Sequence, residues 1–233
     1  MKALEFQRVR AGYGTTLVLR DVDLVVPAGK TVALLGANGA GKTTLLKTAA
    51  GLMRASSGSI LLDGKPVERL AEYERTRMGL CLVPEGHAIF RQLTVRENLA
   101  MYAGGRRVND AIDKAVSAFP ILGERLTQEA GTLSGGQQQM LALSRALVVD
   151  AQVILADELS MGLAPVIVDE IFEVVEQFRA EGRSLLIVEQ FVARALGVAD
   201  YVYILHKGRV VFVGEPEQCQ HEHVFEQYVG SVA

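Results

Sequence analysis

The sequence predicts an α/β fold with a mainly parallel sheet, an N-terminal antiparallel β sub-domain and a helical sub-domain. Four short apolar runs without alternation are typical of strands that helices cover on both faces. These runs are residues 31–36, 78–83, 152–157 and 184–189. The segments before residue 30 alternate in character, which favours antiparallel strands. From residue 94 to about residue 150 helical patterns replace strand runs, which predicts a helical insertion.

The remaining elements are expected from local patterns. Residues 4–14 and 16–29 are expected as antiparallel strands, and Asp63-Gly64 is a hairpin signal within a further antiparallel piece. Helices are expected at residues 43–53, 94–105, 109–119 and 135–150. Another helix should begin at Pro165, because apolar residues recur at helical spacing after it, and should stop at Gly182. Together with the runs on either side, this helix predicts a right-handed βαβ unit.

Length and composition limit the classes of protein that fit. With 233 residues, 49% of them hydrophobic, the chain can bury a sizeable core. The sequence has no repeat or obvious linker, so we expect one compact unit, with a core from residues 1–85 and 151–233 and a helical sub-domain from residues 86–150. The net charge of −3 and the isoelectric point of 5.9 argue against nucleic acid as a partner.

Targeting signals and metal or disulfide frameworks are not indicated. The first residues carry charges where a secretory signal needs an apolar stretch, and no run reaches the roughly 18 apolar residues that span a bilayer. The two cysteines, Cys81 and Cys219, form no CxxC, and the four histidines have no recognisable metal spacing. An intracellular chain in a reducing compartment is therefore expected.

The stretch GANGAGKTT follows a predicted buried strand and opens a predicted helix. This is the context in which G-x-x-x-x-G-K-[ST] cradles phosphates with backbone N–H groups, so a P-loop NTPase core is predicted. Lys42 can reach the β- and γ-phosphates, and Thr43 can supply a hydroxyl to Mg²⁺. The expected phosphate-binding residues are Gly36, Ala37, Asn38, Gly39, Ala40, Gly41, Lys42, Thr43 and Thr44.

Two adjacent carboxylates, Asp157 and Glu158, end another apolar run. Asp157 is expected to hold Mg²⁺, and Glu158 to orient or deprotonate the attacking water. An N-cap or turn aspartate is the other interpretation of Asp157. Because ligands bind beyond the carboxyl ends of the strands in open α/β sheets, Gln190 should face the same edge and could hydrogen-bond the γ-phosphate or its water.

A second glycine-containing helix start lies in LSGGQQQ, where Ser134, Gly135 and Gly136 precede a helical pattern. From these residues alone it is either a capped helix or a second anion-binding site. A single phosphate loop needs no second site within its own chain. If the segment binds an anion, the economical explanation is that it serves the nucleotide of another subunit.

Together these motifs resemble those of the ATP-binding subunits of ABC transporters, and the resemblance covers essentially the whole chain as a single ABC ATPase domain. GANGAGKTT is similar to the Walker A motif, VILADE to the Walker B motif with its catalytic glutamate, and LSGGQ to the ABC signature. Tyr13 matches the aromatic residue that stacks on adenine in the family. Without the resemblance Tyr13 reads as a strand or turn tyrosine.

The resemblance implies an ATPase that works as a head-to-tail dimer with two ATP molecules and Mg²⁺ between its subunits. Ser134, Gly135, Gly136 and Gln137 would contact the nucleotide held by the neighbour. Closing the dimer would pull on integral membrane permease subunits, which receive solute from a binding protein. The chain would then lie on the inner, cytoplasmic face of the cell membrane.

Within the family, the segments at residues 83–98, 157–165 and 187–190 resemble the smaller ATPase subunit of branched-chain amino-acid importers. That subgroup typically carries Glu85 where most relatives have glutamine, and Gln190 where most have the switch histidine. A glutamine can donate and accept hydrogen bonds but cannot become a cation. The chain departs from the wider family pattern at Leu159, Ala164, Ala156 and His87.

The loss of the switch histidine and the retention of the signature together lead to the hypothesis of a heterodimer with unequal sites. In this heterodimer the chain's own Walker motifs would form the less orthodox site, and its signature would complete the partner's. A homodimer stays open from the sequence. The segment from Gly86 to Leu93 matches the family region that grips a permease helix, and ordinary packing between sub-domains is the other interpretation.

Competing functions differ in what they would require. A urea or amide importer subunit remains open. A soluble ABC-type ATPase would usually carry tandem copies or a long coiled-coil insertion, and a kinase or GTPase would not need LSGGQ.

Overall fold

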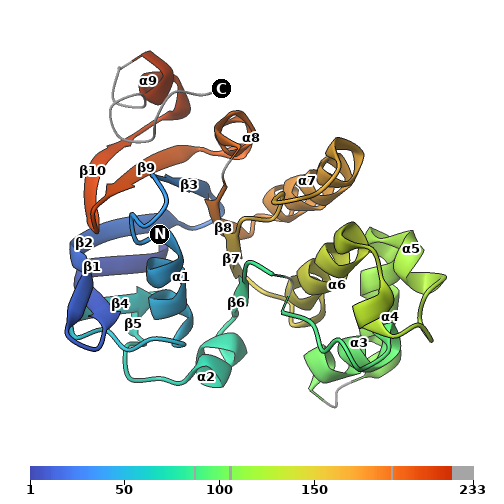
Figure 1. Cartoon of the computed structure of the whole chain (residues 1–233). Helices are drawn as coiled ribbons and strands as arrows, with labels where there is room; N and C mark the ends of the chain where they lie inside the picture. The colour runs from blue at the N-terminus through green and yellow to red at the C-terminus, as the bar shows by residue number, and fades with distance from the viewer. Residues whose placement is uncertain (87, 105–106, 190, 222–233) are drawn as a thin grey trace.

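The computed structural model describes residues 1–86, 88–104, 107–189 and 191–221. These residues form two β-sheets and a group of helices (Figure 1). The strand order is β2-β1-β4-β5 in the first sheet and β10-β9-β3-β8-β7-β6 in the second. Within the described part of the chain, no helix has the length and apolar character needed to cross a membrane.

The first sheet is antiparallel and comes from the N-terminal part of the chain, as the alternating patterns predicted. Its strands are β1 (Lys2–Tyr13), β2 (Thr16–Pro27), β4 (Ser57–Leu62) and β5 (Lys65–Pro66). All pairings between neighbours are antiparallel. The turn at Asp63-Gly64 joins β4 to β5, which confirms the hairpin signal.

The second sheet contains the four predicted buried runs as parallel neighbours. They are β3 (Thr31–Leu35), β6 (Leu80–Val83), β7 (Val153–Asp157) and β8 (Ser184–Val188), and every residue in them is buried. The sequence reading did not identify the two strands at the other edge, β9 (Tyr201–His206) and β10 (Arg209–Gly214). β9 runs parallel to β3, and β10 forms an antiparallel hairpin with β9.

The five helices that periodicity predicted are present, and the structure adds α2, α5, α8 and α9. In chain order the helices are α1 (Lys42–Ala50), α2 (Glu72–Arg77), α3 (Val95–Ala103), α4 (Val108–Ala118), α5 (Pro120–Gly123), α6 (Gly135–Val148), α7 (Pro165–Ala180), α8 (Val192–Val198) and α9 (Pro216–His221), with a 3₁₀ turn at Ala130–Thr132. α1 is shorter than predicted. Gly51 adopts a left-handed conformation with φ of 84° and caps the helix, so the expected continuation to residue 53 does not form.

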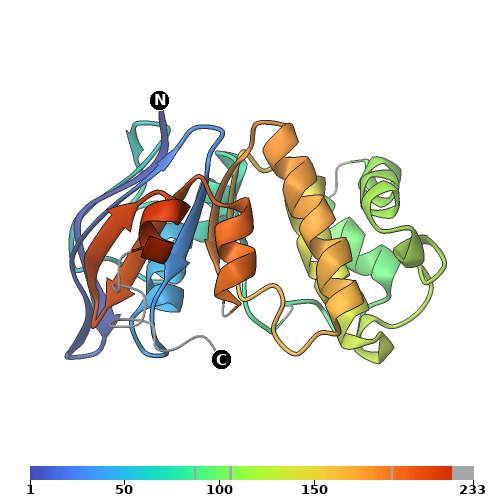
Figure 2. The ribbon, with the colours of Figure 1, turned by 90° about the horizontal axis from the view of Figure 1, so that it is seen from above.

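The apolar residues of β8 show how the second sheet is covered. Leu185 and Ile187 pack into a cluster with α3 to α7, whereas Leu186 and Val188 pack with α1 and the antiparallel sheet. Alternate residues of a strand point to opposite faces, so both faces of the sheet are buried. α7 lies between the sheet and the group formed by α3, α4, α5 and α6 (Figures 1 and 2).

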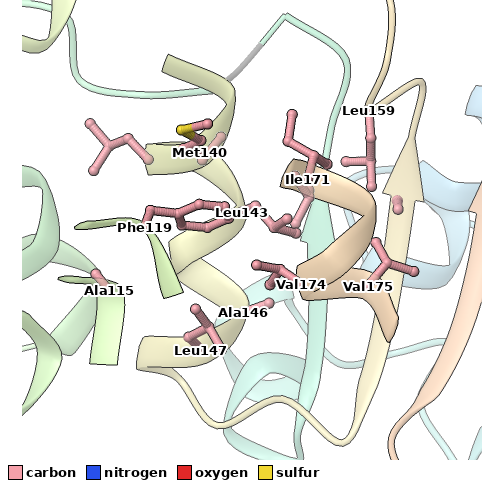
Figure 3. Packing of buried hydrophobic residues seen from close by; sticks show 14 of the residues in the cluster. Ala115, Phe119, Met140, Leu143, Ala146, Leu147, Leu159, Ile171, Val174 and Val175 are labelled. Carbon is pink, nitrogen blue, oxygen red and sulfur yellow. The ribbon is translucent and has the colours of Figure 1, made fainter. Parts of the chain in front are cut away.

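Helix α6 occupies the centre of the first of these clusters. Phe119 packs on one side of α6, and Ile171 and Val174 of α7 pack on the other (Figure 3). α6 also contacts β6, so it joins the helical group to the sheet. A displacement of α6 therefore cannot occur without a change at the sheet, because close-packed interiors transmit strain.

Candidate functional site

The loop between β3 and α1 has a backbone that only glycine allows at key positions. Gly36 has φ of 151°, and a Cβ at this position would collide with the carbonyl oxygen of Leu205 in β9. The N–H of Gly208 donates to the carbonyl oxygen of Ala40 at 2.9 Å. α1 begins at Lys42 without a side-chain cap, so its first N–H groups point out of the helix with no side-chain acceptor. These N–H groups are available to an anion.

Lys42 lies inside this loop rather than in solvent. Its side chain is buried, and Nζ donates to the carbonyl oxygens of Gly36 at 2.7 Å and Ala37 at 3.2 Å. Burial lowers the pKa of Lys42, while the carboxylates of Glu158 and Asp157 raise it. The ammonium group therefore lies within the electrostatic reach of both carboxylates.

Asp157 ends β7 with its carboxylate almost completely buried, at 1% exposure. Burial raises the pKa of Asp157, and a hydrogen bond from the Thr43 side chain opposes that effect. Glu158 and Glu85 raise the same pKa further, and Lys42 lowers it. The structure thus places Lys42, Thr43, Glu85 and Glu158 within electrostatic or hydrogen-bonding reach of Asp157.

One oxygen of Asp157 is left unsatisfied. Within the described part of the chain, Oδ1 is buried without a hydrogen-bond partner. Such an atom costs about 1–3 kcal/mol unless a ligand or water satisfies it. No group of three or more His, Cys, Asp or Glu side chains among the described residues could hold a metal alone. A hard cation at Asp157 would therefore take the rest of its shell from hydroxyl, water or phosphate oxygens, a donor set that suits Mg²⁺.

Glu158 follows Asp157 in an unusual backbone conformation. Its φ is 52°, in the left-handed region that non-glycine residues seldom adopt. Its N–H donates to the carbonyl oxygen of Val188 in β8 at 2.8 Å. Backbone strain of this kind persists where the surroundings hold it in place, and it is concentrated at functional sites.

The start of α6 differs from the start of α1. Ser134 Oγ accepts from the N–H of Gln137 at 3.3 Å, and Gln137 Oε1 accepts from the N–H of Ser134 at 3.2 Å, which closes a capping box. Ser134 and Gly135 are exposed and Gly136 is buried. A Cβ on Gly136 would lie 2.5 Å from the Ile167 side chain of α7, so any larger residue would force that side chain to shift. α6 and α1 lie on opposite sides of β7 (Figures 1 and 2).

The other predicted site residues are placed as follows. Tyr13 ends β1 with 53% of its surface exposed. Ala37, Asn38 and Gly39 are exposed at the tip of the loop, and Ala40, Gly41 and Thr44 are buried beneath it. Gln190 and His87 lie outside the described residues, so the expectation for Gln190 has no structural counterpart here.

Sequence reasoning missed a buried polar pair beside this site. Glu189, at the end of β8, accepts hydrogen bonds from the backbone N–H and the hydroxyl of Ser160. The available signal was a carboxylate ending an apolar strand, which must find donors if it is buried.

A cavity of about 820 Å³ lies elsewhere, between α2, α4 and α6. Its lining includes Tyr73, Tyr102 and Arg145 but no residue of the phosphate loop and neither Asp157 nor Glu158.

Comparison with known proteins gives the family. The sequence profile of the ABC transporter family matches residues 19–160. The chain is 46% identical to the high-affinity branched-chain amino acid transport ATP-binding protein BraG of Pseudomonas aeruginosa, over 89% of this chain and 91% of BraG. It is 38% identical to the probable branched-chain amino acid transport ATP-binding protein LivF of Archaeoglobus fulgidus, over 94% and 95% of the two chains.

A solved structure described as the ATP binding subunit of an ABC transporter superposes with a TM-score of 0.83. The two sequences are 28% identical, and the match covers 98% of this chain and 95% of the other. The phosphate loop, the buried Asp157 and the family match agree with one another. The chain belongs to the ABC transporter family, as an ATP-binding subunit that hydrolyses ATP.

Proposed function

We propose that this chain energises an importer of branched-chain amino acids by hydrolysing ATP. The similarity to BraG and LivF supports the solute class. Glu85 and Gln190 also fit the subgroup that the sequence resembles. The observation that carries the ATPase site is the buried, unpartnered Oδ1 of Asp157, which lies within electrostatic reach of Lys42 and Thr43.

For nucleotide binding, we assign the triphosphate to residues 36–44, with Lys42 directed at the β- and γ-phosphates. Lys42 is already buried among backbone carbonyls, so a phosphate would replace those acceptors with a charged one. Thr43 and Asp157 would hold Mg²⁺, which neutralises charge on the phosphates when it is bound. Tyr13 would stack on the adenine, and its exposed ring at the end of β1 supports that role.

For the chemical step, we assign Glu158 as the residue that orients the attacking water and accepts its proton. Its carboxylate lies beside Asp157 and within electrostatic reach of Lys42. Lys42 would stabilise charge that develops on the transferred phosphoryl group. Gln190 would hydrogen-bond the γ-phosphate or the water, and Glu85 would contact the nucleotide or its magnesium shell.

A second ATPase subunit would complete the site. α6 and α1 flank β7 on opposite sides (Figures 1 and 2), which supports a role for the start of α6 apart from this chain's own phosphate loop. The residues concerned are Ser134, Gly135, Gly136 and Gln137. We assign them to the nucleotide of the partner subunit, in a heterodimer with unequal sites. The exposed Ser134 and Gly135 support an intermolecular role.

The membrane partner is assigned to the segment from Gly86 to Leu93. Phe90 is 47% exposed there, and the buried amide of Asn98 holds its loop by bonds to the backbone of Phe90, Leu93 and Thr94. An exposed aromatic residue on a well-held loop suits a permease helix. The chain would sit on the cytoplasmic face of the membrane, and a solute-binding protein would act through the permease.

We further assign residues 1–85 and 151–233 to the nucleotide-binding core and residues 86–150 to the helical sub-domain, within a single domain. α3, α4, α5 and α6 all come from residues 86–150 and contact one another, which supports this division.

Transport by the assembled complex tests the proposal. Complexes purified with their membrane partners and reconstituted in vesicles should take up leucine on addition of ATP and should not take up urea. If the vesicles took up urea and not leucine, urea would be the transported solute and the proposed solute class would be wrong. Ser134→Arg should abolish turnover more completely than Gln190→Ala. If Gln190→Ala abolished transport while Ser134→Arg were harmless, the assignment of unequal sites would be wrong.

A further inference from the structure

The buried pair formed by Glu189 and Ser160, here called the Glu189–Ser160 pair, lies next to the proposed catalytic residue. The N–H of Ser160 donates to Glu189 Oε1 at 3.2 Å, and its hydroxyl donates to Oε2 at 2.5 Å. Glu189 is 3% exposed and Ser160 1% exposed. The two residues are 29 positions apart in the sequence, so the pair joins the end of β8 to the segment that follows β7.

The environment of this carboxylate makes its hydrogen bonds important. Burial raises the pKa of Glu189, and the bonds from the Ser160 side chain and from the backbone of Ser160 and Leu159 oppose that effect. The nearby Glu158 also raises the pKa of Glu189 by like-charge repulsion. A carboxylate in such a place is tolerated because donors from one short segment satisfy it.

The segment that supplies these donors begins at Glu158 and is held from three directions. The N–H of Glu158 donates to the carbonyl oxygen of Val188 in β8. Leu159 is 1% exposed and packs in the cluster with Ile171 of α7 (Figure 3). Ser160 is bound by Glu189. These three contacts fall on Glu158 and the two residues that follow it, and the backbone of Glu158 is in the left-handed region.

We propose that Glu189 is a positioning residue for ATP hydrolysis: by binding Ser160 it holds Glu158 in its left-handed backbone conformation and so directs the Glu158 carboxylate toward the phosphate site. The inference rests on the proposed role of Glu158. A residue with φ near 52° relaxes toward the common backbone regions when its neighbours release it. Relaxation would turn the Glu158 side chain away while leaving the phosphate loop unchanged.

The experiment uses full-length chain in the assembled complex, with ATP turnover and binding of a fluorescent ATP analogue measured on the same samples. Glu189→Ala should lower kcat about tenfold or more and change nucleotide affinity less than about threefold. Ser160→Ala removes only the hydroxyl group and should also lower kcat. This variant provides the test if Glu189→Ala does not fold. Loss of kcat and affinity together would overturn the inference.

Conservative variants separate positioning from general stabilisation. In Glu189→Gln, Oε1 can accept the Ser160 N–H and Nε2 can donate to the Ser160 hydroxyl, so most of kcat should return. Ser160→Thr keeps the hydroxyl and should also retain activity. If Glu189→Gln lost as much turnover as Glu189→Ala, hydrogen bonding to Ser160 would not be the cause.

A matched control is available at the other end of β8. Ser184 is also buried, at 3% exposure, and its Oγ accepts from the N–H of Gly29 at 2.9 Å. Ser184→Ala should lower the thermal midpoint much as Ser160→Ala does, without changing kcat. Equal loss of kcat in both variants would show that turnover follows stability alone and would contradict the proposal.

A double variant separates the proposed role of Glu158 from the proposed positioning role of Glu189. In a Glu158→Gln background, Glu189→Ala should cause no additional loss of turnover, because its effect passes through Glu158. If Glu158→Gln kept full turnover, the proposed function of Glu158 would fail. If Glu158→Gln abolished turnover while Glu189→Ala and Ser160→Ala were harmless, only the positioning inference would fail.

Discussion

The starts of α1 and α6 look alike in sequence and differ in structure. Glycines lie just before α1 and in the first turn of α6, and each helix start presents N–H groups that suit an anion. α1 has no side-chain cap and begins at a buried lysine near the buried carboxylate of Asp157 and the half-buried one of Glu158. α6 closes a capping box on itself, and Ser134 and Gly135 at its start are exposed. In the proposed function, the first is a nearly complete site within one chain, whereas the second needs a partner subunit.

The comparison teaches that a helix start becomes a binding site through what surrounds it. At α1, the order of the strands brings Asp157 at the end of β7 close to Lys42 and Thr43 in the first turn of the helix. At α6 the bond between Ser134 Oγ and the N–H of Gln137 is 3.3 Å long and exposed, so an incoming phosphate can replace it at little cost. In the proposed dimer, the charges that α6 lacks come from the partner subunit.

The largest expected effect is at α1. Lys42→Ala should weaken ATP binding by the isolated chain about 100-fold, because it removes a charged donor from a buried site. Lys47→Ala, in the last turn of the same helix, is the control and should bind normally. Titration with a fluorescent ATP analogue measures both. Normal binding by Lys42→Ala would show that α1 is no more a complete site than α6.

The next effect separates the two helix starts. Ser134→Arg should leave the nucleotide affinity of the isolated chain within about twofold of wild type and lower turnover of the assembled complex at least about tenfold, since a bulky cation would block the partner's nucleotide. Equilibrium binding and steady-state hydrolysis provide the two measurements. A loss of nucleotide affinity in the isolated chain would show that Ser134 binds the chain's own nucleotide, which would contradict its assignment to the partner's nucleotide.

A smaller effect concerns how α6 is seated. Gly136→Ala should lower the free energy of unfolding by about 1–2 kcal/mol, because its Cβ would press on Ile167. Gly135→Ala is the matched control: the nearest atom to its Cβ is Leu163 Cδ2 at 3.7 Å, an ordinary contact. Urea unfolding monitored by circular dichroism compares them. Equal losses in the two variants would mean that the packing on α7 does not distinguish these glycines.

The smallest expected effect is a change in stability at alkaline pH that depends on Cys81. This residue lies in β6, the strand that both α1 and α6 contact. Burial raises the pKa of Cys81 to about 11 from an ordinary value of 9.0. The folded state therefore holds the thiol proton more tightly than the unfolded state, and this contribution to stability is present below pH 9 and lost as the pH rises to about 11. Wild type should lose stability over that range more steeply than Cys81→Ala, as urea titrations at each pH would show. Parallel pH profiles would contradict the assigned burial of the strand.

The residues that make local patterns could be predicted from the sequence, and those that meet across the fold could not. The buried strands and GANGAGKTT can be recognised from a few consecutive residues. The structure confirms the strands, and it confirms that GANGAGKTT lies between a strand and a helix. The hairpin of β9 and β10 was overlooked. The bond between Ser160 and Glu189 depends on which strands become neighbours, and single-sequence periodicity holds no record of that.

The same limit explains the end of α1. Helical periodicity continues past Ala50, yet the Gly51 N–H turns back to the carbonyl oxygens of Lys47 and Thr48 and stops the helix. The role of Gln190 stays a prediction.

The placement of β3 between β8 and β9 has a consequence for synthesis on the ribosome. The phosphate loop is translated long before β9, but Gly36 packs on the Leu205 carbonyl and Ala40 accepts a hydrogen bond from Gly208. These two supports are therefore added to the loop late in translation. We expect a nascent polypeptide that has not yet reached Gly208 to lack the scaffold that holds a nucleotide, and to gain no stability from cellular ATP.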